Sequence, residues 1–230
     1  MTSPAPVALR GVSAPNLPLP AGAWDTHAHV FGPFEHFPLS ADCRYQPPFA
    51  PRPDYLAMLD AVGFAKGVLV HPSANGFDNR TTLDALQHSP ARLRGVAVVA
   101  EESSEAELAG LHAAGVRALR FTENGEVLGV AKPAGILGLD ALRRMAPRLR
   151  ELGWHAQIWA KSAFLAESAH WLQDCGLPLV IDHMGSVDVT LGVDHVHFQS
   201  LLSLVDGGAT WVKLITGRVT RQRWFDAADV

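Results

Sequence analysis

The segment Trp24-Asp25-Thr26-His27-Ala28-His29-Val30 has the pattern of a short β-strand, and the rest of the chain is organised around it. Side chains alternate between the two faces of a strand, so Asp25, His27 and His29 are predicted to share one face. Two imidazoles on one face can bind a metal ion or polarise a carbonyl group. Two histidines that merely lie near a strand end would look the same, and only the remaining sequence can separate these interpretations.

After this segment, short apolar runs alternate with longer amphipathic runs. The pattern predicts seven strands, at residues 24–30, 66–71, 94–100, 116–121, 154–160, 179–183 and 210–214. Between them it predicts six helices, at residues 54–64, 79–88, 104–114, 139–152, 163–175 and 195–206. Ser104 stands three residues before Glu107, which is the spacing of a helix capping box. Strict alternation of this kind indicates a parallel sheet with right-handed crossovers.

Two α/β architectures fit such alternation, a (β/α)8 TIM barrel and an open doubly wound sheet. No Gly-X-Gly-X-X-Gly motif follows the first strand and no phosphate loop occurs, which disfavours the open sheet. Barrel active sites collect at the C-terminal ends of the strands. The polar residues at the predicted strand ends are His27, His29, His71, Ser73, Arg120, Gln157, Asp182, His183, Lys213 and Arg218. We therefore predict an α/β fold of the (β/α)8 TIM-barrel type.

The predicted barrel is incomplete, because a typical barrel has eight β/α units in about 250 residues. We expect residues 1–22 to form a proline-rich N-terminal arm. We expect residues 23–230 to form one barrel domain that lacks the eighth strand and is truncated after strand seven. An unclosed barrel exposes unpaired strand edges, so the chain is expected to be a fragment, a truncated product or a protein that closes as a homo-oligomer.

Composition restricts the partners of this chain. Its formal net charge is −4 without basic runs or acidic tails, which predicts a small-molecule substrate and neither a nucleic-acid nor a membrane partner. Cys43 and Cys175 are too few and too far apart for a disulfide framework or a zinc ribbon. The N-terminal stretch lacks the pattern of a secretory signal, and no apolar run is long enough to span a bilayer. A soluble, cytoplasmic protein is expected.

A third histidine, His183, ends the apolar run Leu179–His183. A single histidine at a strand end is more often a hydrogen-bonded core residue than a functional one. Together with His27 and His29, however, it would supply three nitrogen ligands at one rim of the barrel and leave a position for water. That arrangement is typical of catalytic zinc sites.

Several segments are familiar in order and spacing. They are DTHAHVFGP (25–33), VLVHPSANGFDN (68–79), GVRALRF (115–121), WHAQIWA (154–160), LPLVIDHMG (177–185) and WVKLITGR (211–218). Together they resemble the amidohydrolase superfamily, and within it the branch of pyrone-dicarboxylate lactonases and related lactone hydrolases. The resemblance implies the expected barrel fold and an amidohydrolase-type enzyme.

The resemblance also implies roles for the histidines. His27, His29 and His183 would bind a divalent metal ion, zinc or manganese. The fourth strand has no lysine that could be carbamylated to bridge a second metal, so at most one ion is expected. In the pyrone-dicarboxylate branch the same histidines hold the lactone carbonyl without a metal, and this metal-free mechanism stays open. The resemblance places the water-activating aspartate on an eighth strand, which the pattern does not contain.

Arginines after strands four and seven bind a substrate carboxylate in the lactonase branch. These roles would fall on Arg120 and Arg218, although each could instead form a surface salt bridge. The loop after Arg120 lacks a further arginine, which favours a substrate with one acidic group or a polyhydroxylated lactone. Tyr45, Ser73 and Gln157 are predicted to hydrogen-bond the substrate. Lys213 is either a lysine of the catalytic rim or only a charge at a strand end.

We therefore expect a hydrolase that opens a lactone or similar cyclic ester of a small carboxylated organic acid. Water would attack a carbonyl group that His27, His29 and His183 polarise. Two alternatives remain at this point. One is a metal-dependent decarboxylase of the same superfamily, and the other is a catalytically inactive, truncated ligand binder.

Overall fold

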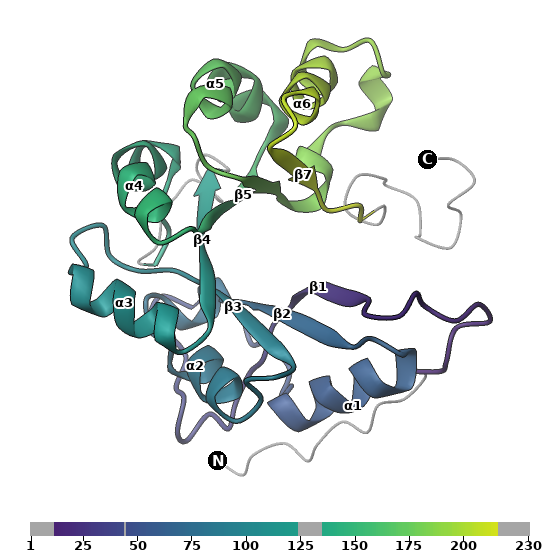
Figure 1. Cartoon of the computed structure of the whole chain (residues 1–230), viewed down its shortest axis with the longest axis vertical. Coiled ribbons are helices and arrows are strands. Elements are labelled where there is room, and N and C mark those ends of the chain that lie inside the picture. The colour runs from purple at the N-terminus through teal and green to yellow at the C-terminus, as the bar shows by residue number, and fades with distance from the viewer. Residues whose placement is uncertain (1–11, 44, 124–134, 216–230) are drawn as a thin grey trace. The chain divides into compact units, whose positions relative to one another are not determined.

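The computed structural model describes residues 12–43, 45–123 and 135–215 (Figure 1). Within the chain, contacts define two compact units. Unit 1 comprises Met1–Arg117 with Pro133–Gly135, and unit 2 comprises Ala118–Lys132 with Ile136–Val230.

Unit 1 is built from parallel strands that alternate with helices. Its elements are β1 (Trp24–Ala28), α1 (Arg52–Val62), β2 (Lys66–Val70), the 3-10 helix η1 (Ser73–Asn75), α2 (Arg80–Gln87), β3 (Leu93–Ala97) and α3 (Glu105–Ala113). Strand β2 pairs in parallel with β1 and with β3. Helix α3 begins at the predicted capping box, because Ser104 Oγ accepts a hydrogen bond from Glu107 N and Ser104 N donates to the Glu107 carboxylate.

Unit 2 repeats the same pattern. Strand β4 (Val116–Glu123) begins in unit 1 and runs into unit 2. It is followed by α4 (Leu139–Glu151), β5 (His155–Ala160), α5 (Ser162–Asp174), β6 (Leu179–Ile181), the 3-10 segments η2 (Asp182–Ser186) and η3 (Val189–Leu191), α6 (Val196–Asp206) and β7 (Thr210–Val212). The core of this unit includes the fully buried side chains of Leu142, Leu149, Trp154 and Ile158.

The strands form one sheet in the order β1-β2-β3-β4-β5-β6-β7. Each of the pairs β1–β2, β2–β3, β4–β5, β5–β6 and β6–β7 is parallel. Sequential parallel strands with helices between them are the arrangement of a (β/α)8 barrel, so the predicted fold class is confirmed. In the described part of the chain this pattern comprises seven strands.

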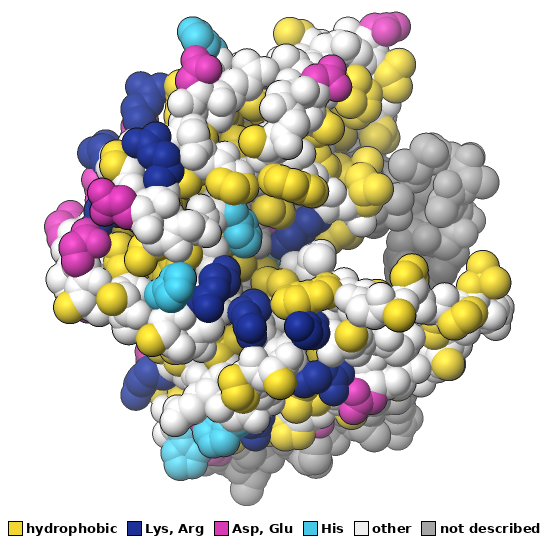
Figure 2. Space-filling model, in the orientation of Figure 1, with side chains coloured by type: hydrophobic (Ala, Val, Ile, Leu, Met, Phe, Trp, Pro, Cys, Tyr) yellow, Lys and Arg dark blue, Asp and Glu magenta, His cyan; other side chains and the backbone are white. Residues whose placement is uncertain are grey.

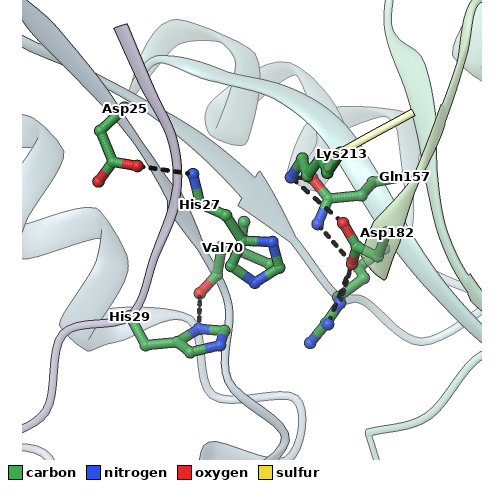
Figure 3. A network of polar contacts seen from close by, with 8 residues as sticks. Asp25, His27, His29, Val70, Gln157, Asp182 and Lys213 are labelled. Atoms are coloured by element: carbon green, nitrogen blue, oxygen red, sulfur yellow. Dashed lines mark hydrogen bonds and ion pairs between the residues drawn. The ribbon is translucent and has the colours of Figure 1, made fainter. Parts of the chain in front are cut away.

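Strand β1 departs from the predicted alternation. The pairing register with β2 shifts between Asp25 and Ala28, which marks an irregularity of the β-bulge type. The Asp25 carboxylate accepts a hydrogen bond of 2.8 Å from the Tyr55 hydroxyl of α1. Asp25 therefore faces α1, and the prediction that it shares a face with His27 and His29 is wrong because the bulge interrupts the two-residue period (Figure 3).

Strand β6 is shorter than the apolar run that predicted it. It ends at Ile181, and the backbone then enters the left-handed region at His183 (φ 56°), Met184 (φ 54°) and Gly185 (φ 62°). A Cβ at Gly185 would lie 3.0 Å from Leu165 Cδ1, so the turn is also tightly packed against α5. His183 thus lies in a turn, where the alternation of a strand does not decide where its side chain points.

None of the helices in the described ranges has the length and apolar character that crossing a membrane requires. The surface of unit 2 nevertheless carries exposed apolar side chains around η3 and the start of α6 (Figure 2). These side chains are Val189, Leu191, Val193 and Val196.

Candidate active site

The imidazole rings of His27 and His29 lie next to each other in unit 1. The ring centroids lie 5.1 Å apart and the rings are almost perpendicular. His29 Nδ1 lies 2.7 Å from the Val70 carbonyl oxygen at the end of β2 (Figure 3). A carbonyl oxygen can only accept, so Nδ1 must carry the hydrogen, and in the neutral ring the lone pair then belongs to Nε2.

This contact of His29 is the usual second contact of a metal-binding histidine, in which one ring nitrogen donates to a backbone carbonyl and the other binds the ion. The same contact orients the ring for a hydrogen bond from a protonated Nε2 to a substrate. The residues of unit 1 therefore fit both mechanisms that the sequence left open.

Other polar residues of unit 1 have structural contacts. His71 is 1% exposed, and its Nε2 donates to the Gly76 carbonyl at 2.9 Å. Burial and the charge of Asp25 raise the pKa of Tyr55, which keeps its hydroxyl protonated as the donor to Asp25. Ser73 lies exposed at the start of η1, and Tyr45 is 51% exposed. The substrate contacts proposed for Ser73 and Tyr45 remain predictions.

Unit 2 contains a buried cluster around Asp182, whose side chain is completely buried (Figure 3). Asp182 Oδ2 accepts from Arg120 Nη2 at 3.1 Å, from Arg120 Nε at 3.3 Å and from Gln157 Nε2 at 3.0 Å. Asp182 Oδ1 lies 3.3 Å from Lys213 Nζ, which also donates to Gln157 Oε1 at 2.9 Å. We call these four residues the Asp182 cluster.

Four parallel strands assemble the Asp182 cluster, and Arg120 and Gln157 lie within their strands rather than at the predicted strand ends. Arg120 comes from β4, Gln157 from β5, and Asp182 and Lys213 directly follow β6 and β7. The side chains of Arg120 and Lys213 are only 7% and 9% exposed. Burying such charges is costly unless each one is paired and hydrogen-bonded, and the cluster meets that requirement.

His155 and the charged cluster interact electrostatically. Burial is the main cause that lowers the pKa of His155 to about 4, and the positive charge of Lys213 lowers it further against the opposing effect of Asp182. His155 is therefore neutral at pH 7, and it adds no charge to the cluster.

Trp159 connects Arg120 with His183. The Arg120 guanidinium carbon lies 5.1 Å from the centre of the Trp159 ring, in a cation–π arrangement. The His183 ring makes an edge contact with the same Trp159 ring, and the two ring centroids lie 5.8 Å apart. His183 is itself buried, with 6% of its surface exposed. The aromatic ring thus restricts both the arginine and the histidine that the sequence proposed for the site.

Sequence reasoning placed Arg120, Gln157 and His183 in the site, and the structure brings Arg120 and Gln157 into one cluster. It gave Asp182 no role in the site. The available signal was its position two residues after Val180, because alternate residues of a strand share a face and Val180 pairs with Gln157. Arg218, the second predicted carboxylate ligand, lies outside the described residues.

A comparison with protein-family models matches residues 24–229 of this chain to the amidohydrolase family, Amidohydro_2. Two of the relatives with curated names are lactone hydrolases from different bacteria. A 2-pyrone-4,6-dicarboxylate hydrolase of Comamonas testosteroni is 39% identical over 193 residues, which cover 84% of this chain and 61% of the relative. A 4-sulfomuconolactone hydrolase of Rhizobium radiobacter is 36% identical over 206 residues, which cover 89% of this chain and 67% of the relative.

This chain is also similar to a solved structure. The crystal structure of a candidate 2-pyrone-4,6-dicarboxylic acid hydrolase from Acinetobacter baumannii, with citric acid bound, matches with a TM-score of 0.73 at 31% identity. The match covers 86% of this chain and 72% of that protein. The chain spans less than two thirds of the length of the Comamonas relative.

Proposed function

The chain belongs to the amidohydrolase family, and we propose that it is a hydrolase that opens a lactone of a small carboxylated organic acid. The observation that supports this most strongly is the kinship with two hydrolases named for different substrates, a pyrone dicarboxylate and a sulfomuconolactone. Both names describe a cyclic ester with acidic substituents. The shared chemistry is the opening of such a ring by water.

The proposed roles divide between two groups of residues. His27, His29 and His183 act on the ester carbonyl and stabilise the negative charge that develops on its oxygen when water attacks. Arg120 binds a carboxylate of the substrate and so orients the ring. The cation–π contact with Trp159 supports this role because it holds the guanidinium in place before the substrate arrives.

We propose that the three histidines hold one divalent metal ion, zinc or manganese. The contact between His29 Nδ1 and the Val70 carbonyl supports this, because it leaves the lone pair on Nε2. When bound, such an ion would supply a Lewis acid for the carbonyl or lower the pKa of a water molecule. In the metal-free alternative, protonated imidazoles would donate hydrogen bonds to the carbonyl oxygen.

We assign the base that activates water to no described residue. Asp25 accepts from Tyr55, and Asp182 accepts from Arg120 and Gln157. Both carboxylates serve as hydrogen-bond acceptors for the protein itself. The cost of taking either away from its donors would be large, since buried donors would lose their partners.

A substrate panel tests the proposed function. The full chain is incubated with 2-pyrone-4,6-dicarboxylate, a monocarboxylated 2-pyrone, sulfomuconolactone and an uncharged lactone, with zinc, manganese or a chelator. Ring opening is followed by the loss of ultraviolet absorbance, and carbon dioxide release is recorded in parallel. We expect ring opening of at least one acidic lactone. Release of carbon dioxide without ring opening would identify a decarboxylase instead, and no reaction with any compound would contradict the proposal.

The variant Arg120→Gln tests the carboxylate contact. For an acidic lactone, we expect kcat/KM to fall by roughly 100-fold, since a charge-assisted hydrogen bond is lost. The uncharged lactone should be much less affected. Arg143→Gln is the matched control, because Arg143 belongs to the same unit but lies exposed on α4 against Trp171. Equal losses for the acidic and the uncharged lactone would contradict a specific role of Arg120.

A further inference from the structure

We propose that Asp182 is a positioning residue that limits the Asp182 cluster to one substrate carboxylate. The inference rests on the proposed function and specifies its substrate class. Asp182 itself is not proposed to touch the substrate. It acts through Arg120 and Lys213, the two cations that it binds.

One carboxylate binds both cations, Arg120 through Oδ2 and Lys213 through Oδ1. Gln157 links the same groups, because its amide donates to Asp182 Oδ2 and its carbonyl oxygen accepts from Lys213 Nζ. Asp182, Gln157 and Lys213 therefore form a closed ring of contacts that directs Lys213 Nζ toward protein acceptors.

Arg120 and Lys213 are positive and Asp182 is negative, so these three side chains together carry one positive charge. The low exposure of all three weakens screening by solvent, which makes a single unit of charge important for anion binding. One substrate carboxylate neutralises the positive charge that the cluster carries. A second carboxylate at the same place would need a further positive charge, and Asp182 already neutralises that one.

A lactone with a single carboxylate at this end of the molecule fits the cluster better than one with two adjacent carboxylates. Replacement of Asp182 by asparagine keeps the shape of the side chain, removes its charge and releases Lys213 for a second carboxylate. The variant is thus expected to gain affinity for polycarboxylates, which a merely structural role of Asp182 would not produce.

The experiment measures citrate binding by calorimetry for four full-length proteins. They are the wild type, Asp182→Asn, Lys213→Met and the double variant with both changes. We expect Asp182→Asn to bind citrate about tenfold more tightly than the wild type, because the cluster gains one unit of positive charge. In the Lys213→Met background, Asp182→Asn should also tighten citrate binding about tenfold, because it raises the net charge of the cluster by the same one unit.

The comparison in the Lys213→Met background keeps the test valid if Asp182→Asn alone does not fold. The double variant removes both charges of the Asp182–Lys213 ion pair, so neither charge of this pair stays buried without the other. Thermal unfolding of each protein identifies the variants that fold. The inference is overturned if Asp182→Asn leaves the citrate affinity unchanged or lowers it in the folded proteins of either background.

Kinetics give a second measurement. The ratio of kcat/KM for the dicarboxylated over the monocarboxylated 2-pyrone should rise about tenfold in Asp182→Asn and return toward the wild-type ratio in the double variant. A fall in both activities with an unchanged ratio would show a structural role only and would overturn the inference. Because citrate binding requires no ring opening, a chain that opens no lactone but shows the expected citrate affinities contradicts the proposed function alone.

Discussion

At the scale of single residues, the surroundings of each imidazole determine what it can do. His29 donates from Nδ1 to Val70, whereas His71 donates from Nε2 to Gly76 and is completely enclosed. His155 is held neutral by burial and by the nearby charge of Lys213. Histidines of the same chain therefore serve as a candidate ligand, a structural donor and a neutral, half-buried residue.

The low pKa of His155 predicts a pH-dependent loss of stability. Its pKa is about 4 in the folded chain and 6.5 ordinarily, so between these values the unfolded chain binds a proton that the folded chain does not. The free energy of unfolding should therefore decrease as the pH falls from 6.5 to 4, by about 3 kcal/mol in total. Denaturant titrations at several pH values would measure this.

The variant His155→Gln should lack this part of the pH dependence. His170→Gln is the control, because the side chain of His170 is 94% exposed. If the wild type and His155→Gln lost stability in parallel between pH 6.5 and pH 4, His155 would not be the responsible group.

At the scale of elements, the packing of α1 on β2 depends on one glycine. A Cβ at Gly67 would overlap the hydroxyl of Tyr55. That hydroxyl also donates to Asp25 of β1, so a single tyrosine connects the helix with two neighbouring strands. The close approach of β2 to α1 thus helps to place the β1 segment that contains the paired histidines.

Substitution of this glycine should disturb that contact. We expect Gly67→Ala to lower the free energy of unfolding by about 1–3 kcal/mol, since the added methyl group forces Tyr55 to move. Tyr55→Phe removes the overlapping oxygen, so the double variant should lose less than the sum of the two single variants. Denaturant unfolding of the four proteins measures the difference.

Gly110→Ala on α3 provides the control for this experiment. Nothing lies within 4 Å of a Cβ at Gly110, and alanine favours a helix over glycine by about 1 kcal/mol. It should therefore be neutral or stabilising. Additive effects of Gly67→Ala and Tyr55→Phe would contradict the proposed contact.

At the scale of the whole molecule, metal binding would connect residues that are far apart in the chain. If His27, His29 and His183 share one ion, zinc binds the folded chain preferentially and stabilises it, by about 3 kcal/mol at 100 times the dissociation constant. We expect zinc to raise the midpoint of thermal unfolding of the chelator-treated protein. His183→Ala should abolish the increase, while His170→Ala should retain it.

Elemental analysis of the purified protein provides an independent measurement of the same site. One equivalent of metal in the wild type and none in His183→Ala is the expected result. An unfolding midpoint that zinc does not change, together with no bound metal, would contradict the metal proposal and favour the metal-free mechanism.

Much of the molecule follows from the sequence alone. Local periodicity determined the strands, the helices between them and the parallel α/β class, because each pattern depends on residues a few positions apart. The capping box at Ser104 was visible for the same reason. The paired histidines, His183 and Arg120 indicated the amidohydrolase family, which the family model confirms over residues 24–229.

Only the tertiary structure decided which partners these residues have. The bulge in β1 turned Asp25 toward α1, and the register that pairs Arg120 with Gln157 and Gln157 with Val180 placed Asp182, two residues after Val180, among Arg120, Gln157 and Lys213. Arg120 and Asp182 lie 62 positions apart, and their contact follows from the packing of separate strands rather than from any local period. The sequence thus determined which chemical groups reach the strand ends, while packing determined how their charges are paired.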